Sequence, residues 1–360
     1  MQKQSGKKFD KGLVFVVMLL LIIGLIILYS TSAYNGRVKF HDSFYYLKKQ
    51  LFATSLGLAL MYAVANIDYH VWQRLSLPAY FVAITLSIVV LLFGQEYNGS
   101  KRWLSFGPFS FQPSEFAKLA VILFLADVIT KKGKKMKTMK TMVWVMIIIL
   151  PIVGLIGASN LSTAIIILGI AAVLVFVASP YYARFIWLGL SGVSFMTIFL
   201  ALESYRLERL AIWRNPEKYE KGYQTLQGLY AIGSGGLFGN GLGNSIQKLG
   251  FVPEAQNDMI FSIVCEEMGL LGASFLILLF LLLIWRFFVI ATRASDFYGA
   301  LIATGAMAHM MIQVILNIAV VTNTIPNTGI TLPFVSYGGT SVMFLLVEMG
   351  LVLSVSSLLE

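Results

Sequence analysis

The sequence contains few of the residues that carry redox and metal chemistry. Among its 360 residues there is one cysteine, Cys265, and there are three histidines, His41, His70 and His309. A single cysteine excludes an intrachain disulfide, and histidines this far apart do not match a metal-binding motif. We therefore expect neither a disulfide framework nor a metal centre built from cysteine and histidine.

Charge is also scarce, and this excludes an ordinary soluble domain. Only 12% of the residues are charged and 58% are hydrophobic, whereas soluble domains have about 25% charged residues. Apolar runs long enough to cross a bilayer, about 17–25 residues, recur along the chain. We predict an all-α integral membrane protein, a single polytopic domain over residues 1–360 with about ten transmembrane helices. The expected spans are 13–33, 46–66, 77–95, 113–130, 142–158, 160–179, 184–203, 259–290, 298–322 and 339–358.

The placement of lysines predicts the orientation, because short cytoplasmic loops are enriched in Lys and Arg. Four lysines precede or open the first span and six follow the fourth span: Lys3, Lys7, Lys8 and Lys11, and Lys131, Lys132, Lys134, Lys135, Lys137 and Lys140. An even number of spans then places both termini in the cytoplasm. The net charge of +10 does not indicate a nucleic-acid partner, since these lysines lie beside helix ends without interleaved aromatic residues. We expect them to meet anionic lipid.

Two polar segments fall on the opposite, extracytoplasmic side. One is long, about 204–258, and lies between the seventh and eighth spans. The other, 323–341, holds two prolines and three glycines between two apolar segments. Proline and glycine interrupt helices, and non-helical backbone at membrane depth is tolerated only where it is buried in protein or lines a wet cavity. We therefore predict a re-entrant segment before the tenth span that borders a polar site, with a plain connecting loop as the alternative.

Asp258 is the strongest candidate for chemistry, because it lies where the long outer segment becomes the eighth span. Loss of water at this boundary would raise the pKa of its carboxyl group towards that of a useful general base. A helix N-terminus would act in the opposite direction. Asp is also a preferred helix N-cap, so a capping role is the alternative, and the sequence leaves both open.

Other polar residues near the spans allow a structural and a functional interpretation. Glu115 and Lys118 lie one turn apart near the outer end of the fourth span, where they can pair or contact a substrate. The glycine-rich run 233–245 allows tight packing or an anion nest for a lipid diphosphate. It lacks the Gly-Lys-Ser/Thr ending of a nucleotide loop. Glu266 and Glu267 are expected within the bilayer, where either could bind substrate, relay protons or form a buried structural pair with a basic group such as Lys118.

Several short motifs occur in order along nearly the whole chain. They are Lys49-Gln50, Asn98-Gly99 with Arg102-Trp103, Pro113-Ser114-Glu115 with Lys118, Gly222-Tyr223-Gln224 with Gln227, the run 233–245, Glu254 through Asp258, Glu266 through Gly269, and Pro326 through Gly339. Each is weak alone, but the ordered set is specific. The chain resembles the SEDS family (shape, elongation, division and sporulation), which includes the FtsW, RodA and SpoVE membrane proteins. Residues 317–340 are most similar to the FtsW and SpoVE members.

The resemblance implies a peptidoglycan glycosyltransferase that polymerises lipid II on the outer face of the bacterial cytoplasmic membrane. Asp258 matches the essential carboxylate of the family and would be the general base on the acceptor sugar hydroxyl, with undecaprenyl diphosphate leaving. The expected substrate-binding residues are Lys49, Lys101, Arg102, Glu115, Lys118, Tyr223, Gln224, Gln227, Ser336 and Tyr337, and Arg206, Arg209 and Arg214 lie in the same outer segment. No cofactor is required, although a divalent cation could assist the diphosphate. The expected partners are a class B penicillin-binding protein and other division or elongation proteins.

One position departs from the family pattern. Many relatives carry Pro-Asp-Leu-Gly-Thr where residues 159–163 of this chain read Ser-Asn-Leu-Ser-Thr, so we expect no catalytic role there. Two other functions remain open. A lipid II flippase would need polar groups along a path across the midplane, and a non-catalytic division scaffold would need no carboxylate chemistry at all.

Overall fold

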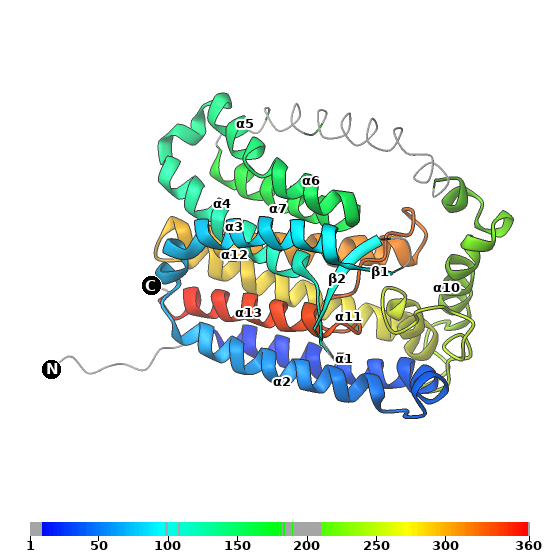
Figure 1. Cartoon of the computed structure of the whole chain (residues 1–360). Coiled ribbons are helices and arrows are strands. Elements are labelled where there is room, and N and C mark those ends of the chain that lie inside the picture. Colours follow the sequence, from blue (N-terminus) through cyan, green and yellow to red (C-terminus); the bar gives the residue numbers. More distant parts are fainter. Residues whose placement is uncertain are drawn as a thin grey trace.

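The computed structural model describes residues 9–97, 100–106, 109–179 and 210–358, together with positions 181, 183 and 189. Its architecture is a bundle of long helices that run side by side (Figure 1). The helices are α1 (Lys11–Phe40), α2 (Tyr45–Asn66), α3 (Tyr69–Phe93), α4 (Pro113–Lys132), α5 (Met139–Ile147), α6 (Leu150–Ser159), α7 (Leu161–Ala178), α10 (Tyr223–Ser234), α11 (Ile260–Arg293), α12 (Phe297–Val321) and α13 (Gly339–Ser356). Short 3-10 turns are η1 (Gly133–Lys137), η2 (Pro216–Lys218) and η3 (Glu220–Gly222).

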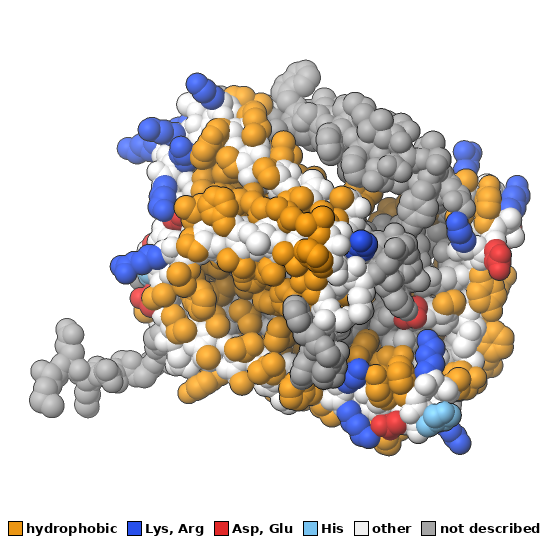
Figure 2. Space-filling view, viewed as in Figure 1, with side chains coloured by type: hydrophobic (Ala, Val, Ile, Leu, Met, Phe, Trp, Pro, Cys, Tyr) orange, Lys and Arg blue, Asp and Glu red, His pale blue; other side chains and the backbone are white. Residues whose placement is uncertain are grey.

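The protein is mostly helical and crosses the membrane several times. Within the described residues, seven helical stretches are long and apolar enough to span a bilayer. Helices α2 and α4 occupy the second and fourth predicted spans but are less apolar. The predicted seventh span, 184–203, lies almost wholly outside the described residues, so the count of ten and the orientation stay predictions. Hydrophobic side chains cover the flank of the bundle, and Lys and Arg gather at its two ends (Figure 2).

A small sheet departs from the all-helical prediction. Strands β1 (Gln95–Tyr97), β2 (Ser100–Phe106) and β3 (Phe109–Phe111) form a three-stranded antiparallel sheet in the order β1-β2-β3. Two of the three strands have only three residues, which is too short for the alternation that predicts a strand. The sheet connects α3 to α4 and lies at the end of the bundle near α10 (Figure 1).

The predicted fifth span is divided into two helices, α5 and α6. The break falls at Ile148 and Ile149, and Pro151 is the second residue of α6. Proline has no N–H and cannot extend the hydrogen-bond ladder of α5, but it is well tolerated at the start of a new helix. The apolar run predicted the span correctly but not this interruption.

The described ends of the chain meet at one end of the bundle (Figure 1). The backbone N–H of Asp10 donates to Ser356 Oγ over 3.1 Å, and the Asp10 carboxylate pairs with Arg286 of α11. Asp10 also caps α1, because its side chain accepts from Leu13 N. The same end contains the start of α3, where Tyr69 donates to Asp296 just before α12. The two described ends of the chain therefore lie at one end of the bundle, and the polar segments lie at the other.

Small residues allow α2 and α13 to pack closely. A Cβ atom added at Gly57 would lie 2.7 Å from Leu346 Cδ1, and one added at Gly350 would lie 2.7 Å from the carbonyl oxygen of Met61. Close backbone approach through small residues is a common source of stability between membrane helices. This contact fixes α13 and, through it, the segment 323–338 that precedes it.

Candidate active site

The polar segments meet at the end of the bundle opposite the termini, around Asp258. Asn317, near the end of α12, is fully buried and donates to two carbonyl oxygens, that of Asp258 at 2.8 Å and that of Ile330 at 2.7 Å. Ser336 Oγ donates to the Asn257 carbonyl at 2.6 Å. The turn before α11 and the segment 323–338 are therefore tied both to each other and to α12.

Asp258 is buried, with 9% of its surface exposed, and does not serve as the cap of α11. The N-cap residue is Met259, and no side chain caps the helix. Burial raises the pKa of Asp258 to about 6, because loss of water disfavours the charged carboxylate, and the negative charge of Glu254 acts in the same direction. Gln224 of α10 lies at hydrogen-bonding distance, 3.5 Å from Asp258 Oδ1. This environment suits a general base.

Gly329 brings Asp258 and Arg102 to a common space. Its φ is +69°, a left-handed conformation that favours glycine. A Cβ atom added there would lie 4.0 Å from both Asp258 Oδ2 and Arg102 Nη1. Because no side chain fills this position, a carboxylate and a guanidinium face the same small volume. A substrate bound there could give a proton to the carboxylate and place a negatively charged group beside the guanidinium.

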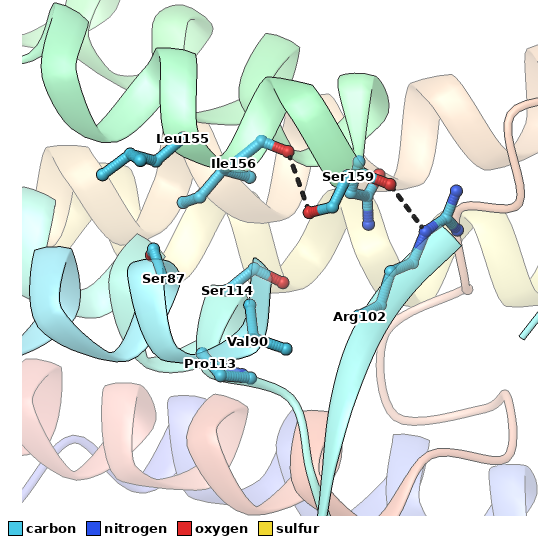
Figure 3. A pocket seen from close by; sticks show the side chains of 9 residues that line it. Ser87, Val90, Arg102, Pro113, Ser114, Leu155, Ile156 and Ser159 are labelled. Carbon is cyan, nitrogen blue, oxygen red and sulfur yellow. Dashed lines mark hydrogen bonds between the residues drawn. The ribbon is translucent and has the colours of Figure 1, made fainter. Parts of the chain in front are cut away.

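Arg102 is held in place by the end of α6. Its Nε donates to the carbonyl of Ser159 at 3.0 Å (Figure 3). The cavity beside it, between Ser87, Val90, Ser114 and Ile156, has a volume of about 10 Å³, which is room for about one water molecule. That cavity is too small for a sugar or a phosphate, so it is part of the wall that orients Arg102. Asn160, the residue after Ser159, caps α7 by accepting from Thr163 N.

Comparison with known proteins settles the family. The family model described as "Cell cycle protein", for FtsW, RodA and SpoVE, matches residues 11–360. The chain belongs to the FtsW/RodA/SpoVE family. Stage V sporulation protein E of Bacillus subtilis is 41% identical over 353 residues, which are 96% of each chain. A probable peptidoglycan glycosyltransferase FtsW of Trichlorobacter lovleyi is 33% identical over 97% of this chain and 93% of its own.

Solved structures agree with this assignment. The crystal structure of the rod shape determining protein RodA of Thermus thermophilus matches with a TM-score of 0.73 and 29% identity, over 97% of this chain and 96% of that one. A chain from a structure described as "Structural coordination of polymerization and crosslinking by a peptidoglycan synthase complex" matches with a TM-score of 0.83 and 29% identity, over 97% of each chain. The bundle therefore has the RodA-like fold of the FtsW/RodA/SpoVE family.

In this member of the FtsW/RodA/SpoVE family, α10 carries three of the predicted substrate residues, and one of them lies beside Asp258. Gln224 is the closest, and its Nε2 also lies 3.3 Å from the Pro253 carbonyl. Tyr223 is 43% exposed, and Gln227 is half-buried one turn further along the same helix. Gln224 therefore contacts the Asp258 carboxylate, and a substrate contact by Tyr223 or Gln227 stays a prediction.

Ser336 and Tyr337 hold the site together through contacts within the protein. Ser336 Oγ accepts from Leu332 N at 2.8 Å in addition to its bond with Asn257. The Tyr337 ring packs edge-on against Tyr46, with ring centroids 5.0 Å apart, and burial raises the pKa of its hydroxyl to about 12. A substrate contact by either residue stays a prediction.

The predicted cations fall into different surroundings. Lys49 is on the exposed side of α2, where its amine donates to the Tyr45 hydroxyl at 2.7 Å. Lys101 and Arg102 are adjacent on β2, and side chains alternate along a strand, so Lys101 points away from α6. Arg214 is exposed. Asn98, Gly99, Arg206 and Arg209 lie outside the described residues.

The ion pair predicted between Glu115 and Lys118 is present. Lys118 Nζ lies 3.0 Å from Glu115 Oε1 and donates to Gln313 Oε1 over 3.0 Å. Lys118 is only 2% exposed, so its ammonium group is engaged inside the protein. Whether this pair also contacts substrate stays a prediction.

Glu266 and Glu267 are buried, and Glu267 forms the expected structural pair with a basic group, although that group is not Lys118. Glu267 pairs with Lys248 of the outer segment, with Nζ 2.6 Å from Oε1, rather than with Lys118. Glu266 accepts from the hydroxyl of Ser245 and from Ile246 N. The part of α11 after Gly269 is about 36 Å long at 1.5 Å per residue, enough to cross a bilayer core of about 30 Å. This length alone does not fix the depth of the two carboxylates, which stays a prediction.

The glycine-rich run completes an interrupted helix. α11 breaks at Gly269, where φ is +64°. Asn240 N donates to the Glu266 carbonyl at 2.9 Å, and Leu270 N donates to the Gly236 carbonyl at 2.9 Å. Peptide groups that lose their helical partners at the break thus find them in the run 233–245. This supports the packing interpretation of the glycines rather than an anion nest.

Sequence reasoning missed Glu348 of α13, which lies 2.8 Å from His309 of α12. Both are in strongly apolar segments, and an ionisable residue inside such a segment is expensive and therefore notable. That signal was present in the sequence. The spacing gave no indication that the two residues meet.

Proposed function

We propose that this chain is a peptidoglycan glycosyltransferase that polymerises lipid II at the outer face of the bacterial cytoplasmic membrane. Relatives that match nearly its whole length are named probable peptidoglycan glycosyltransferases. The observation that carries the proposal is the buried Asp258, whose pKa is raised to about 6 and which faces Arg102 across the empty side-chain position of Gly329. A base and a cation at one point are what transfer from a diphosphate requires.

In the proposed reaction, Asp258 accepts the proton of the acceptor sugar's 4-hydroxyl as that oxygen attacks the anomeric carbon of the donor sugar. The bond from the anomeric carbon to the diphosphate oxygen breaks, and undecaprenyl diphosphate leaves with the bonding electrons. The attack is from the face opposite the leaving group, so the anomeric configuration inverts. Asp258 then loses its proton to water. A pKa of about 6 leaves the carboxyl mostly ionised at neutral pH yet basic enough to take a proton.

Arg102 is the best-placed group to stabilise the departing diphosphate. Guanidinium groups bind phosphate oxygens bidentately, and charge that develops on a leaving group is stabilised most by donors that are already in position. The bond to Ser159 uses Nε of Arg102 and orients the rest of the guanidinium. A divalent cation at the diphosphate stays a prediction.

The other predicted substrate-binding residues fall into two groups, those that are exposed or half-buried and those that are bonded inside the protein. We expect Gln224, Tyr223 and Gln227 of α10 to contact the sugars, and Lys49 and Lys101 to attract the diphosphate of an approaching substrate. Glu115, Lys118, Ser336 and Tyr337 are engaged inside the protein, so we expect them to act mainly by holding the site.

A class B penicillin-binding protein is the proposed partner, with other division or elongation proteins as further ones. The support is the similarity to a chain in a peptidoglycan synthase complex that coordinates polymerization with crosslinking. Coupling of the two reactions would explain why the site opens at the outer end of the bundle, where a crosslinking enzyme could receive the new strand.

The test is polymerisation of purified lipid II by the full chain with its partner. Asp258→Asn should reduce the rate by about 10²–10⁴-fold, the usual contribution of a general base. Glu220→Gln is the matched control, since this exposed carboxylate belongs to the same outer segment, and it should keep wild-type activity. Full-length glycan made by Asp258→Asn would remove the proposed base.

The flippase alternative is tested with the same proteins in vesicles that contain lipid II in one leaflet. The mid-membrane residues Gln313, His309 and Glu348 are 2–3% exposed and bonded to each other, which favours a sealed core over a transport path. Accelerated movement of lipid II between leaflets, without glycan synthesis, would favour the flippase. A scaffold would show neither activity.

A further inference from the structure

A chain of buried polar side chains joins three helices below the site. Lys118 of α4, Gln313 and His309 of α12, and Glu348 of α13 are each 2–3% exposed. Gln313 Oε1 lies 3.0 Å from Lys118 Nζ and 2.9 Å from His309 Nε2. His309 Nδ1 lies 2.8 Å from Glu348 Oε2. Polar groups at membrane depth are costly, and the proposed reaction uses none of these four.

The partners of Gln313 fix the direction of every bond. An ammonium group only donates, so the atom of Gln313 that faces Lys118 is the carbonyl oxygen. A backbone carbonyl only accepts, so the atom 3.1 Å from the Thr331 oxygen is the amide nitrogen. Since His309 Nε2 faces the same Gln313 oxygen, it must carry a proton and donate.

It follows that His309 and Glu348 hold one proton between them. With Nε2 protonated, a neutral imidazole presents only a lone pair at Nδ1, and a carboxylate presents only lone pairs as well. A bond of 2.8 Å between them therefore requires either an imidazolium facing a carboxylate or an imidazole facing a carboxylic acid. In both cases the pair is neutral as a whole. The neighbouring pair of Glu115 and Lys118 is neutral too.

The chain ends at the wall of the active site. Gln313 and Asn317 lie one turn apart on α12, and their amides donate to consecutive carbonyls, those of Thr331 and Ile330. Non-helical backbone at membrane depth needs such partners for its carbonyl groups. Gly329, which faces Asp258, directly precedes these two residues.

We infer that His309 and Glu348 are a positioning pair for the active site. The protonated His309 Nε2 holds the Gln313 amide in the orientation that binds the Thr331 carbonyl, and this bond keeps Gly329 beside Asp258. The kinetic part of this inference rests on the proposed glycosyltransferase function, whereas the structural part does not. Neither residue touches substrate in this scheme.

Hydrogen exchange of the full chain in detergent tests the structural part. Glu348→Leu removes the partner of His309 Nδ1 and should raise exchange in peptides covering 326–332 by about tenfold or more. Glu348→Gln can donate an amide N–H to Nδ1 without a shared proton, so exchange there should stay within about twofold of wild type. The matched control is Glu267→Leu, which removes another carboxylate that is 2% exposed. That change should loosen 236–250 and leave 326–332 unchanged.

Lipid II polymerisation tests the kinetic part. Glu348→Leu should lower kcat about tenfold with KM unchanged, whereas Glu348→Gln should keep kcat close to wild type because it can still bond to His309. If Glu348 only filled space in the core, the two variants would have similar kcat values. His309→Phe keeps the ring volume without its nitrogens and serves as a second disruptive variant should Glu348→Leu not fold. Wild-type exchange in 326–332 for folded Glu348→Leu or His309→Phe, or equal loosening by Glu348→Gln, would overturn the inference. A wild-type chain that makes no glycan with its partner would defeat the proposed function but leave the exchange test intact.

Discussion

The smallest residue of the site, Gly329, controls how Asp258 and Arg102 approach a common point. Its positive φ favours glycine over residues with a side chain. The space around it would still admit a Cβ atom, which would lie at ordinary contact distance from both groups. The space at Gly329 therefore has a chemical use as well as a conformational origin. An added methyl group would occupy the position where the two charged groups meet.

We predict that Gly329→Ala lowers the free energy of unfolding by about 1 kcal/mol, the cost of a left-handed alanine, but lowers glycan synthesis by about tenfold or more. Thermal unfolding and the lipid II assay give the two values. Gly154→Ala is the control, since a Cβ atom on this α6 glycine meets nothing within 4 Å. Equal activity of the two variants would show that the space is not used.

Asp258 gives a pH prediction at the same scale. Its pKa is raised from 3.8 to about 6 by burial, so the folded protein binds this proton more tightly than the unfolded chain. This contribution to stability is full below pH 3.8 and is lost as the pH rises through 6. Two pKa units correspond to about 3 kcal/mol at neutral pH.

Two measurements follow for Asp258. Polymerisation should rise with pH along a single titration centred near pH 6, because only the ionised carboxyl accepts a proton. Asp258→Asn should be inactive yet more stable to heat than wild type at pH 8, and this difference should shrink at pH 5. If Asp258→Asn were less stable than wild type at pH 8, burial of the ionised carboxylate would not be destabilising the folded protein.

At the scale of elements, α11 and the glycine-rich run form one unit. The break at Gly269 would leave peptide groups without partners in an apolar setting, and backbone groups of 236–241 supply them. This arrangement explains why so many glycines occur in 233–245. A Cβ atom at Gly239 would lie 2.2 Å from the Glu267 carbonyl oxygen, closer than any side chain can be.

We predict that Gly269→Ala destabilises the protein by about 3 kcal/mol or more, since its Cβ atom would lie 2.4 Å from Gly239 N and its φ is positive. Thermal unfolding in detergent measures this. Gly233→Ala, in α10, meets nothing within 4 Å and should leave the unfolding temperature nearly unchanged. Similar unfolding temperatures for the two variants would contradict the described docking of the run.

The sequence predicted the helices much better than it predicted their interruptions and contacts. Apolar length alone locates most spans, because a helix must satisfy its own backbone in lipid. The break at Ile148 and the short strands β1 and β3 depend on local detail below the length of such patterns. Pairs such as His309 with Glu348 join residues 39 positions apart, and no periodicity encodes that distance. Asp258 could be predicted because it stands where the polar outer segment joins an apolar span and because it matches the essential carboxylate of the family that the chain resembles.

At the scale of the whole molecule, the described termini lie together at one end and the site at the other. The orientation in the membrane is predicted from the lysines after α4, and it places the site outside. A reagent at the cell surface should therefore reach the outer segment but not the lysines after α4.

Single cysteines test this orientation in a Cys265→Ala background. We predict that Glu220→Cys reacts with a membrane-impermeant thiol reagent in intact spheroplasts, whereas Lys134→Cys reacts only after the membrane is opened. Both native side chains are exposed, so burial does not confuse the comparison. The opposite labelling pattern would invert the orientation and place Asp258 in the cytoplasm.

Asn317 has a mechanical consequence. Its side-chain amide donates to the carbonyls of both Asp258 and Ile330. The proposed base and the backbone next to Gly329 are therefore both attached to α12. Arg102 is anchored elsewhere, on β2 and against α6. A shift of α12 would therefore change the distance between the base and Arg102, because the two are attached to different elements.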